Sequence, residues 1–235
     1  MEENIIYESW KTTPKFYSKD MHQYQNWFDS STSLKESIGL GYIDLHTKII
    51  TPEIYKILGN TNNKKCLEIG FGGGRLLNAA CKVFNEANGI DIHECFDVTE
   101  QFLLSQNSNN YKLFNYNDIE NIKENTIDFV YSFIVFQHFS SIKFFYSYID
   151  LIDKVLTKDG CCNLHLSKNN YNDEDYYFKS INPGEANSTI FYKPDFVNRI
   201  LLEKGFEIVE QGQMTKTPWT TNLSGQFYVI FKRKQ

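Results

Sequence analysis

Several features that would assign the chain to a common functional class are missing from its 235 residues. No apolar run approaches the roughly 18 residues of a membrane span, and the first residues, with Glu2 and Glu3, lack the apolar segment of a signal peptide. The net charge of −5 gives no basic footprint for a nucleic acid, and residues 232–234 are typical of a solvated tail. We therefore expect a cytoplasmic protein that binds neither a membrane nor a nucleic acid.

The five cysteines show no C-x-x-C spacing, which removes the usual signature of a metal or redox site. Several lie inside apolar strand or helix patterns, which favours reduced thiols within a core. With 41% hydrophobic and 16% aromatic residues, the chain can bury one sizeable α/β core together with a lid. We expect one such core.

The most informative feature that is present is residues 66–75, where an apolar segment leads through a run of glycines into a helix. Glycine is needed where the backbone takes a positive φ or where a ligand lies against the main chain. Free N–H groups at the start of a helix also favour a polar or anionic ligand. The dinucleotide fingerprint G-x-G-x-x-G begins at Gly70 and Gly72, but Arg75 replaces its third glycine, which argues against NAD.

The pattern that does fit is E-x-G-x-G-x-G, formed by Glu68, Gly70, Gly72 and Gly74 directly after the expected first strand. With this pattern the chain resembles the class I S-adenosylmethionine-dependent methyltransferases that act on small molecules. The resemblance implies an α/β fold with a doubly wound, Rossmann-like, seven-stranded sheet whose last strand is antiparallel. It also implies S-adenosylmethionine as the cofactor and S-adenosylhomocysteine as its product.

Three further segments follow in the order that the family requires. Asp91 comes about 20 residues after the glycines, where a carboxylate accepts the hydrogens of both ribose hydroxyls. Asp118 follows a predicted third strand, where the resemblance implies a contact with the adenine amino group. Residues 127–138 look like the fourth motif, a buried strand that ends in a histidine-bearing turn. The cofactor-binding residues that we expect are Glu68, Gly70, Gly72, Gly74, Asp91, Ile92, Asp118, Ile119 and Phe133.

Strand and helix signals alternate downstream of the glycines, as a doubly wound sheet requires. Pro194 is typical of a helix start, and Gly205 of a helix end. The predicted helices are 76–84, 94–105, 142–156 and 194–204, and the predicted strands after the first are 87–91, 112–114, 127–132, 161–166, 206–209 and 226–231.

Two segments fall outside this pattern. Residues 1–62 are predicted to form an N-terminal helical cap over the cofactor, with a helix at 45–58 leading into the first strand of a core at 63–235. Residues 167–193 form an insertion after the fifth strand, and loops of that length are usually functional. In the methyltransferase fold such an insertion overhangs the acceptor, so we assign it to substrate recognition. The expected substrate contacts are Gln137, Tyr171, Tyr177 and Tyr192.

Methyl transfer from a sulfonium asks the protein to align the acceptor and to remove a proton. Histidine is suited to the proton transfer near neutral pH. His138 lies just past the fourth strand and His165 near the end of the fifth, at the edge where open α/β sheets bind ligands. His138 is the first candidate for the base and His165 the second, although lone histidines are often structural.

Tyrosine and asparagine clusters suit a hydroxyl-rich acceptor. We therefore expect a small polar acceptor, such as a sugar or nucleotide-linked sugar of the kind used in surface-polysaccharide synthesis. Residues 167–170 offer no pair of carboxylates for a hard divalent cation, so the expected mechanism uses no metal. Transfer to a nitrogen of a small molecule and a non-catalytic module that only binds the cofactor stay open.

Overall fold

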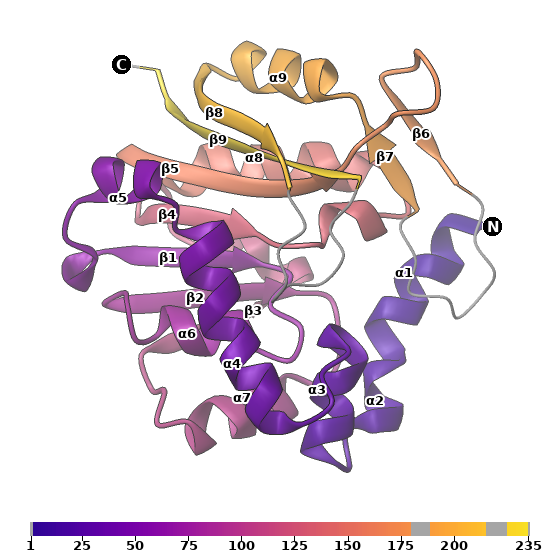
Figure 1. Ribbon diagram of the computed structural model, residues 1–235, viewed down its shortest axis with the longest axis vertical. Helices are drawn as coiled ribbons and strands as arrows, with labels where there is room; N and C mark the ends of the chain where they lie inside the picture. Colours follow the sequence, from indigo (N-terminus) through magenta and orange to yellow (C-terminus); the bar gives the residue numbers. More distant parts are fainter. Residues whose placement is uncertain (1, 180–188, 215–224, 235) are drawn as a thin grey trace. The chain divides into compact units, whose positions relative to one another are not determined.

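The computed structural model describes residues 2–179, 189–214 and 225–234, with the backbone alone for residues 2–5 (Figure 1). The larger sheet has seven strands in the order β3-β2-β1-β4-β5-β9-β8, and a second sheet pairs β6 with β7. The chain divides into two compact units, residues 8–123 and residues 1–7 with 124–235. Within the described ranges, no helix combines the length and apolarity needed to cross a bilayer.

In the unit of residues 8–123, three parallel strands follow a series of short helices. The strand β2 lies between β1 and β3 and pairs in parallel with both. Helices α2 to α5, which the sequence assigned to an N-terminal cap, belong to the same compact unit as these strands. The elements are α1 (Glu2–Thr12, which begins outside this unit), α2 (Pro14–Tyr17), α3 (Met21–Asp29), α4 (Leu34–Asp44), the π-helix η1 (Leu45–Ile49), α5 (Pro52–Leu58), the 3-10 helix η2 (Thr61–Asn63), β1 (Lys65–Ile69), α6 (Arg75–Ala80), β2 (Glu86–Asp91), α7 (Phe96–Ser105), β3 (Tyr111–Asn115) and the 3-10 helix η3 (Tyr116–Asn121).

The helix predicted at 45–58 is wrong in one respect, because two helices occupy that segment. The π-helix η1 ends at Ile49, and α5 begins at Pro52. Proline has no N–H to donate within a helix and is favoured at a first helical position. Thr51 adds a side-chain cap by accepting the N–H of Ile54. The break follows from these two residues, which the apolar periodicity alone does not reveal.

The other unit carries the mixed half of the sheet. Strand β5 pairs in parallel with β4 and antiparallel with β9, and β9 also pairs antiparallel with the edge strand β8. The predicted α/β fold class with an antiparallel last strand is thus confirmed. The elements are β4 (Ile127–Ser132), the 3-10 helix η4 (Phe136–His138), α8 (Ile142–Val155), β5 (Leu156–Ser167), β6 (Tyr176–Phe178), β7 (Ile190–Tyr192), α9 (Pro194–Glu203), β8 (Phe206–Gln213) and β9 (Gln226–Arg233).

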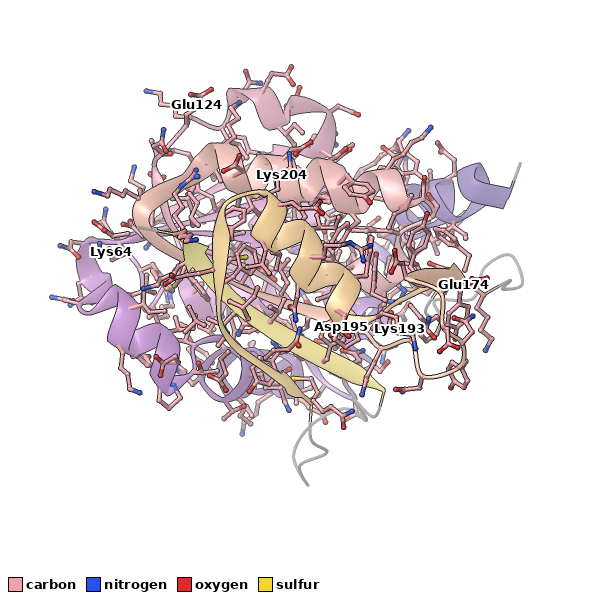
Figure 2. The ribbon with its side chains drawn as sticks, turned by 90° about the horizontal axis from the view of Figure 1, so that it is seen from above. Lys64, Glu124, Glu174, Lys193, Asp195 and Lys204 are labelled. Carbon is pink, nitrogen blue, oxygen red and sulfur yellow. The ribbon has the colours of Figure 1, made fainter. Side chains whose placement is uncertain are left out.

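Helix α9 shows how charge supports the outer layer of this unit. Asp195 lies in its first turn, and Lys204 follows its last residue (Figure 2). An acidic side chain at the start of a helix and a basic one at its end both complement the helix dipole. Lys204 also bonds to Asp150 of α8 at 2.5 Å, so the two helices are linked through an exposed ion pair.

The insertion after β5 contains an antiparallel pair of strands, β6 and β7, which we call the hairpin; residues 180–188 between them lie outside the described residues. The two faces of the hairpin differ. Ile190 and Tyr192 point inward and are fully buried, whereas Tyr177 pairs with Phe191 on the opposite face. The Tyr192 hydroxyl donates to the Phe136 carbonyl at 3.0 Å, so the hairpin is fastened to η4.

All five cysteines are buried with free thiols. Burial raises the pKa of Cys81 to about 11 and that of Cys162 well above its usual range. Because the thiolate is the reactive form, these residues act as small apolar side chains of the core.

The bond that fastens the hairpin generates a stability prediction. Tyr192→Phe should lower the free energy of unfolding by about 1–2 kcal/mol, because the buried Phe136 carbonyl loses its donor. Urea denaturation measures the change. Tyr177→Phe removes a hydroxyl from a half-exposed ring and serves as the control, with an expected change within about 0.5 kcal/mol. Equal losses in both variants would contradict the structural role of the Tyr192 hydroxyl.

Candidate active site

The glycine loop at 70–74 connects β1 to α6 in a conformation that favours glycine. Gly70, Gly72 and Gly74 have φ values of +79°, +49° and +86°. These values lie in the left-handed region, where a Cβ atom is disfavoured. The alternate glycines predicted from the sequence are therefore required by the backbone itself.

Side chains of α3 lie directly against this loop. A Cβ atom on Gly72 would sit 2.8 Å from the Phe28 ring, and one on Gly73 would sit 2.4 Å from the Gln25 amide oxygen. Gln25 is fully buried and donates through Nε2 to the Gly73 carbonyl at 2.6 Å. At Gly72 and Gly73 the absence of a Cβ atom thus allows side chains of α3 to lie against the backbone of the loop.

Asp91, at the end of β2, receives three backbone N–H groups. Oδ2 accepts from Gly72 at 2.8 Å, while Oδ1 accepts from Ile92 at 2.7 Å and from His93 at 3.4 Å. An ionised carboxylate offers about four acceptor sites. One site on Oδ2 is therefore still available, and the long bond from His93 is easily exchanged. The carboxylate is half-buried and held in one orientation, as a group that accepts two ribose hydroxyls should be.

His93 joins the segment after β2 to the glycine loop. Its Nδ1 accepts the N–H of Cys95 at 3.1 Å, and its Nε2 lies 3.0 Å from the Gly72 carbonyl oxygen. A backbone amide only donates, so the ring carries its proton on Nε2 and donates it to Gly72. The ring is buried and packs edge-on against Phe71 and Phe96. Its place two residues before the N-cap residue of α7 is the only sequence signal of this role.

Thr99 and Tyr24 extend the same network. The Thr99 hydroxyl donates to the Gly72 carbonyl at 2.9 Å. A Cβ atom on Gly74 would lie only 2.8 Å from the Thr99 methyl carbon. The Thr99 proton is used for Gly72, so the single Tyr24 hydroxyl proton goes to one of two acceptors, Thr99 Oγ1 at 2.9 Å or the Cys95 carbonyl oxygen at 3.1 Å. Burial raises the pKa of the Tyr24 phenol, so the hydroxyl keeps its proton. Helix α3 is thereby hydrogen-bonded to α7 beside the glycine loop.

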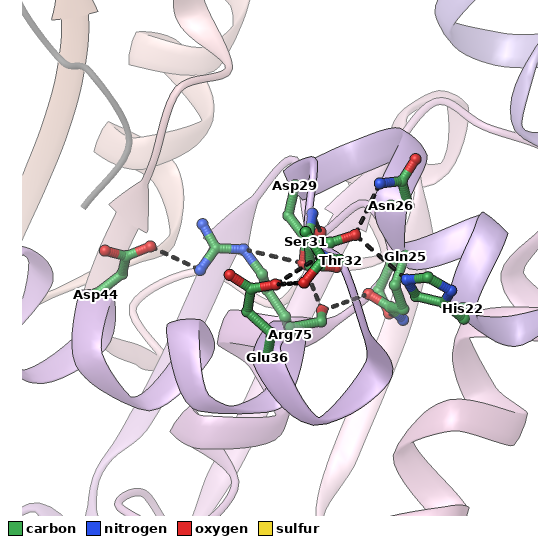
Figure 3. Close-up of polar contacts among 11 residues, drawn as sticks. His22, Gln25, Asn26, Asp29, Ser31, Thr32, Glu36, Asp44 and Arg75 are labelled. Atoms are coloured by element: carbon green, nitrogen blue, oxygen red, sulfur yellow. Dashed lines mark hydrogen bonds and ion pairs between the residues drawn. The ribbon is translucent and has the colours of Figure 1, made fainter. Parts of the chain in front are cut away.

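Arg75, which the sequence analysis noted only as a missing glycine, binds two buried carboxylates (Figure 3). Its NH1 lies 2.7 Å from Asp44, and its Nε lies 3.8 Å from Asp29. Ser37 also donates to Asp29. The guanidinium group connects the first residue of α6 to α3 and α4. The backbones of α4 and α6 also approach closely, since a Cβ on Gly41 would sit 2.3 Å from the Arg75 carbonyl oxygen. The glycine loop is therefore anchored at its far end as well.

The remaining predicted cofactor residues of this unit lie on β1, directly after β2 and in η3. Glu68 is buried within β1, and Ile92 is half-buried directly after Asp91. Asp118 is exposed in η3, at a residue whose φ of −112° departs from the helical value, and Ile119 is half-buried beside it. Their contacts with a cofactor stay a prediction.

The turn after β4, in the other unit, contains a strained residue. Ile134 has a φ of +61°, which is an outlier for a β-branched side chain. Such strain costs of order 1–3 kcal/mol and is typical of sites where the surroundings fix the backbone. Phe133, which precedes it, is buried against the ring of His165 at 5.0 Å between centroids. Nothing in the sequence pattern indicates this conformation.

His138 and Gln137 are adjacent in η4 and contact one another. Nε2 of Gln137 lies 3.1 Å from Nε2 of His138, which is half-exposed. Gln226 donates to Oε1 of Gln137, so the Gln137 amide group presents its N–H to the histidine. Nε2 of His138 is then the acceptor and Nδ1 carries the proton. This tautomer has the lone pair that a general base needs.

His165 lies on β5 and is fully buried. Its ring centroid is 5.0 Å from Phe133 and 6.1 Å from Tyr228, which is its register partner on β9. Burial, with a hydrogen bond to Glu210, raises the pKa of Tyr228 to about 12. The role of His165 as a base stays a prediction.

The three tyrosines predicted to bind the acceptor differ in exposure. Tyr171 is 77% exposed, and Tyr177 is half-buried and stacks on Phe191 with centroids 4.9 Å apart. Tyr171 meets Tyr177 edge-on at 5.9 Å. Tyr192 lies on the inner face of the hairpin, as described above. Only the first two present ring surface to solvent.

Within the described ranges, no group of three or more His, Cys, Asp or Glu side chains is arranged to hold a metal ion.

Residues 67–164 match the model of a family described as a methyltransferase domain. This segment contains the glycine loop, Asp91, Asp118 and the turn after β4. The match confirms the resemblance stated from the motifs. Over these residues the chain is similar to the class I S-adenosylmethionine-dependent methyltransferases, whose cofactor is S-adenosylmethionine. No curated protein sequence matches the chain.

Solved structures share the fold. Magnesium protoporphyrin IX methyltransferase from Synechocystis PCC 6803, with bound S-adenosylhomocysteine, is 14% identical, with a TM-score of 0.67 and coverage of 100% of both chains. The 1,6-didemethyltoxoflavin-N1-methyltransferase of Burkholderia thailandensis is 14% identical, with a TM-score of 0.61 and coverage of 95% of this chain and 88% of that one. The [4+2]-cyclase SpnF is 11% identical, with a TM-score of 0.56 and coverage of 76% and 78%.

The ion pairs of Arg75 lead to a second prediction. Arg75→Gln should lower the free energy of unfolding by about 3 kcal/mol, because two buried carboxylates lose their cation. Lys56→Gln is the control, since it removes a 2.7 Å ion pair with Glu53 that is exposed to solvent, and such pairs contribute about 0–1 kcal/mol. Urea denaturation of both variants compares them. A loss for Arg75→Gln as small as that of the control would refute the anchoring role.

Proposed function

We propose that the chain transfers the methyl group of S-adenosylmethionine to a hydroxyl of a small polar acceptor, such as a sugar or a nucleotide-linked sugar. The main support for cofactor binding is the position of the Asp91 carboxylate. Three backbone N–H groups hold it in place beside the glycine loop. A carboxylate at this point of a βαβ unit is suited to a ribose diol. Asp118, which is exposed on the following segment, is the proposed partner of the adenine amino group.

We also propose that helices α2 to α5 form the cofactor cap. Two observations support this assignment. Phe28 and Gln25 of α3 lie against Gly72 and Gly73, and Arg75 binds carboxylates of α3 and α4. The cap is therefore built onto the backbone of the loop, and the loop conformation depends on it.

In the proposed reaction the acceptor oxygen attacks the methyl carbon, and the carbon–sulfur bond breaks with its electron pair passing to sulfur. The acceptor proton goes to Nε2 of His138, which carries a lone pair in the tautomer described above. Gln137 keeps that tautomer and must release its bond to Nε2 when the acceptor binds. His165 is the second candidate for the base.

The residues proposed to contact the methyl acceptor are Gln137, Tyr171 and Tyr177. The exposed ring of Tyr171 and the outer face of the Tyr177 pair offer stacking surface and hydroxyl groups, which suits a sugar ring or another small planar group. Tyr192 is assigned to holding η4, because its hydroxyl is already bonded to Phe136. The partner is thus a small molecule. A location in the cytoplasm stays a prediction.

Methyl transfer to nitrogen is the second candidate function. The toxoflavin enzyme with this fold acts at N1 of its acceptor, as its name states. The cyclase of the same fold illustrates that a fold alone does not set the reaction. A module that binds the cofactor without catalysis is therefore the third alternative. Screening hydroxylated and amine acceptors against the purified protein separates the three.

Cofactor binding is tested first at Asp91. Asp91→Ala should weaken the affinity for S-adenosylhomocysteine by about 1.5–3 kcal/mol, because the charged acceptor of the ribose hydroxyls is lost. Calorimetric titration measures this, with NAD titrated in parallel. Asp91→Asn keeps one acceptor oxygen and should fall between the wild type and the alanine variant. Unchanged affinity in Asp91→Ala would remove the assignment.

The base is tested at His138. His138→Ala should reduce turnover about 100-fold or more once an acceptor is found, since proton removal loses its catalyst. Affinity for S-adenosylhomocysteine should be retained. His46→Ala, at an exposed histidine of η1, is the matched control. Full turnover in His138→Ala would move the role to another residue, with His165 next in line.

A further inference from the structure

Three hydrogen bonds from one short segment surround Gly72. Its N–H donates to Asp91 at 2.8 Å, and its carbonyl oxygen accepts from His93 at 3.0 Å and from Thr99 at 2.9 Å. A carbonyl oxygen has two lone pairs, so the two donors saturate it. Both peptide groups that flank the Gly72 Cα are therefore fixed, and with them its φ of +49°.

The carbonyl bonds determine where the N–H of Gly72 points. The two peptide planes are joined only by rotation about the Gly72 backbone, and glycine permits most of that rotation. With the carbonyl held by His93 and Thr99, the N–H stays directed at Oδ2 of Asp91. Without them the loop could turn, and the Asp91 carboxylate would lose a partner that fixes its orientation.

The Gly72 carbonyl has more hydrogen-bond donors than the stability of the fold requires. A buried backbone carbonyl needs one donor to be satisfied. Here it has two, both from buried side chains, and His93 uses its other ring nitrogen to accept the N–H of Cys95, the cap residue of α7. Backbone that is fixed by more bonds than stability requires is typical of sites where geometry matters for binding.

We propose that Thr99 and His93 are positioning residues for the cofactor. By saturating the Gly72 carbonyl they hold the Gly72 N–H on Asp91, and so they keep the carboxylate in the orientation that receives the ribose hydroxyls. Tyr24 supports Thr99 from α3 and thereby links the N-terminal helices to the same bonds. The inference rests on the proposed role of Asp91 in binding the cofactor.

The test uses Thr99→Val, which keeps the shape of the side chain and removes only its hydroxyl. Affinity for S-adenosylhomocysteine, measured by calorimetry well below the melting temperature, should fall about tenfold, as expected for one lost buried hydrogen bond. Thr99→Ser keeps the hydroxyl and should restore most of the affinity. His93→Asn retains an acceptor for the Cys95 N–H but loses the donor to Gly72, and should weaken binding to a similar degree.

A double-mutant cycle distinguishes positioning from general stability. If Thr99 acts through Asp91, the Thr99→Val change should have little further effect on affinity in an Asp91→Ala background. Additive losses, or an unchanged affinity in folded Thr99→Val, would overturn the proposal. Failure of the wild type to bind S-adenosylhomocysteine would instead overturn the proposed function. If Thr99→Val does not fold, His93→Asn, which removes the other donor to the Gly72 carbonyl, replaces it in the same cycle.

Discussion

The hydrogen bond from the Gly72 N–H to the Asp91 carboxylate is the interaction on which the candidate cofactor site depends. It joins the loop after β1 to the end of β2, two strands that pair in parallel. Parallel strands bring their carboxyl ends to one edge, but their side chains and loops still have to be oriented there. This bond supplies the orientation, and the donors on the Gly72 carbonyl and the anchors around Arg75 maintain the loop that makes it.

The glycines of the loop serve the protein as much as any ligand. Positive φ values account for Gly70, Gly72 and Gly74, while close packing under Gln25 accounts for Gly73. Helix α3 can approach the backbone only because no Cβ atom stands in the way. A glycine-rich loop is therefore compatible with a cofactor site and also with tight helix packing, and this chain uses Gly72 and Gly73 for the packing of α3.

Local signals were enough to predict most of the sheet. The strand at β2, the helix that begins at Pro194 and the antiparallel pairing of β9 with its neighbours all follow from periodicity, caps and the family pattern. Long-range contacts were not predictable in this way. Arg75 and His93 bond to partners that are 31 and 21 residues away in sequence. A single sequence does not show which distant residues come together, so these contacts could not be predicted. The break at Pro52 was predictable in principle, because proline and its cap are local.

The cofactor side and the acceptor side differ in how much the sequence reveals, and the chemistry explains why. In a βαβ unit, a ribose diol is suited to a carboxylate after the second strand, and a ligand against the main chain requires glycines after the first, so these groups can be found from their order along the chain. An acceptor for a methyl group needs alignment and the loss of a proton, which many side chains can provide. The corresponding features here are the contact of His138 with Gln137 and the strained turn at Ile134, and neither is visible in a sequence pattern. Specificity for the acceptor therefore depends on geometry that only the fold of the turn and the hairpin can set.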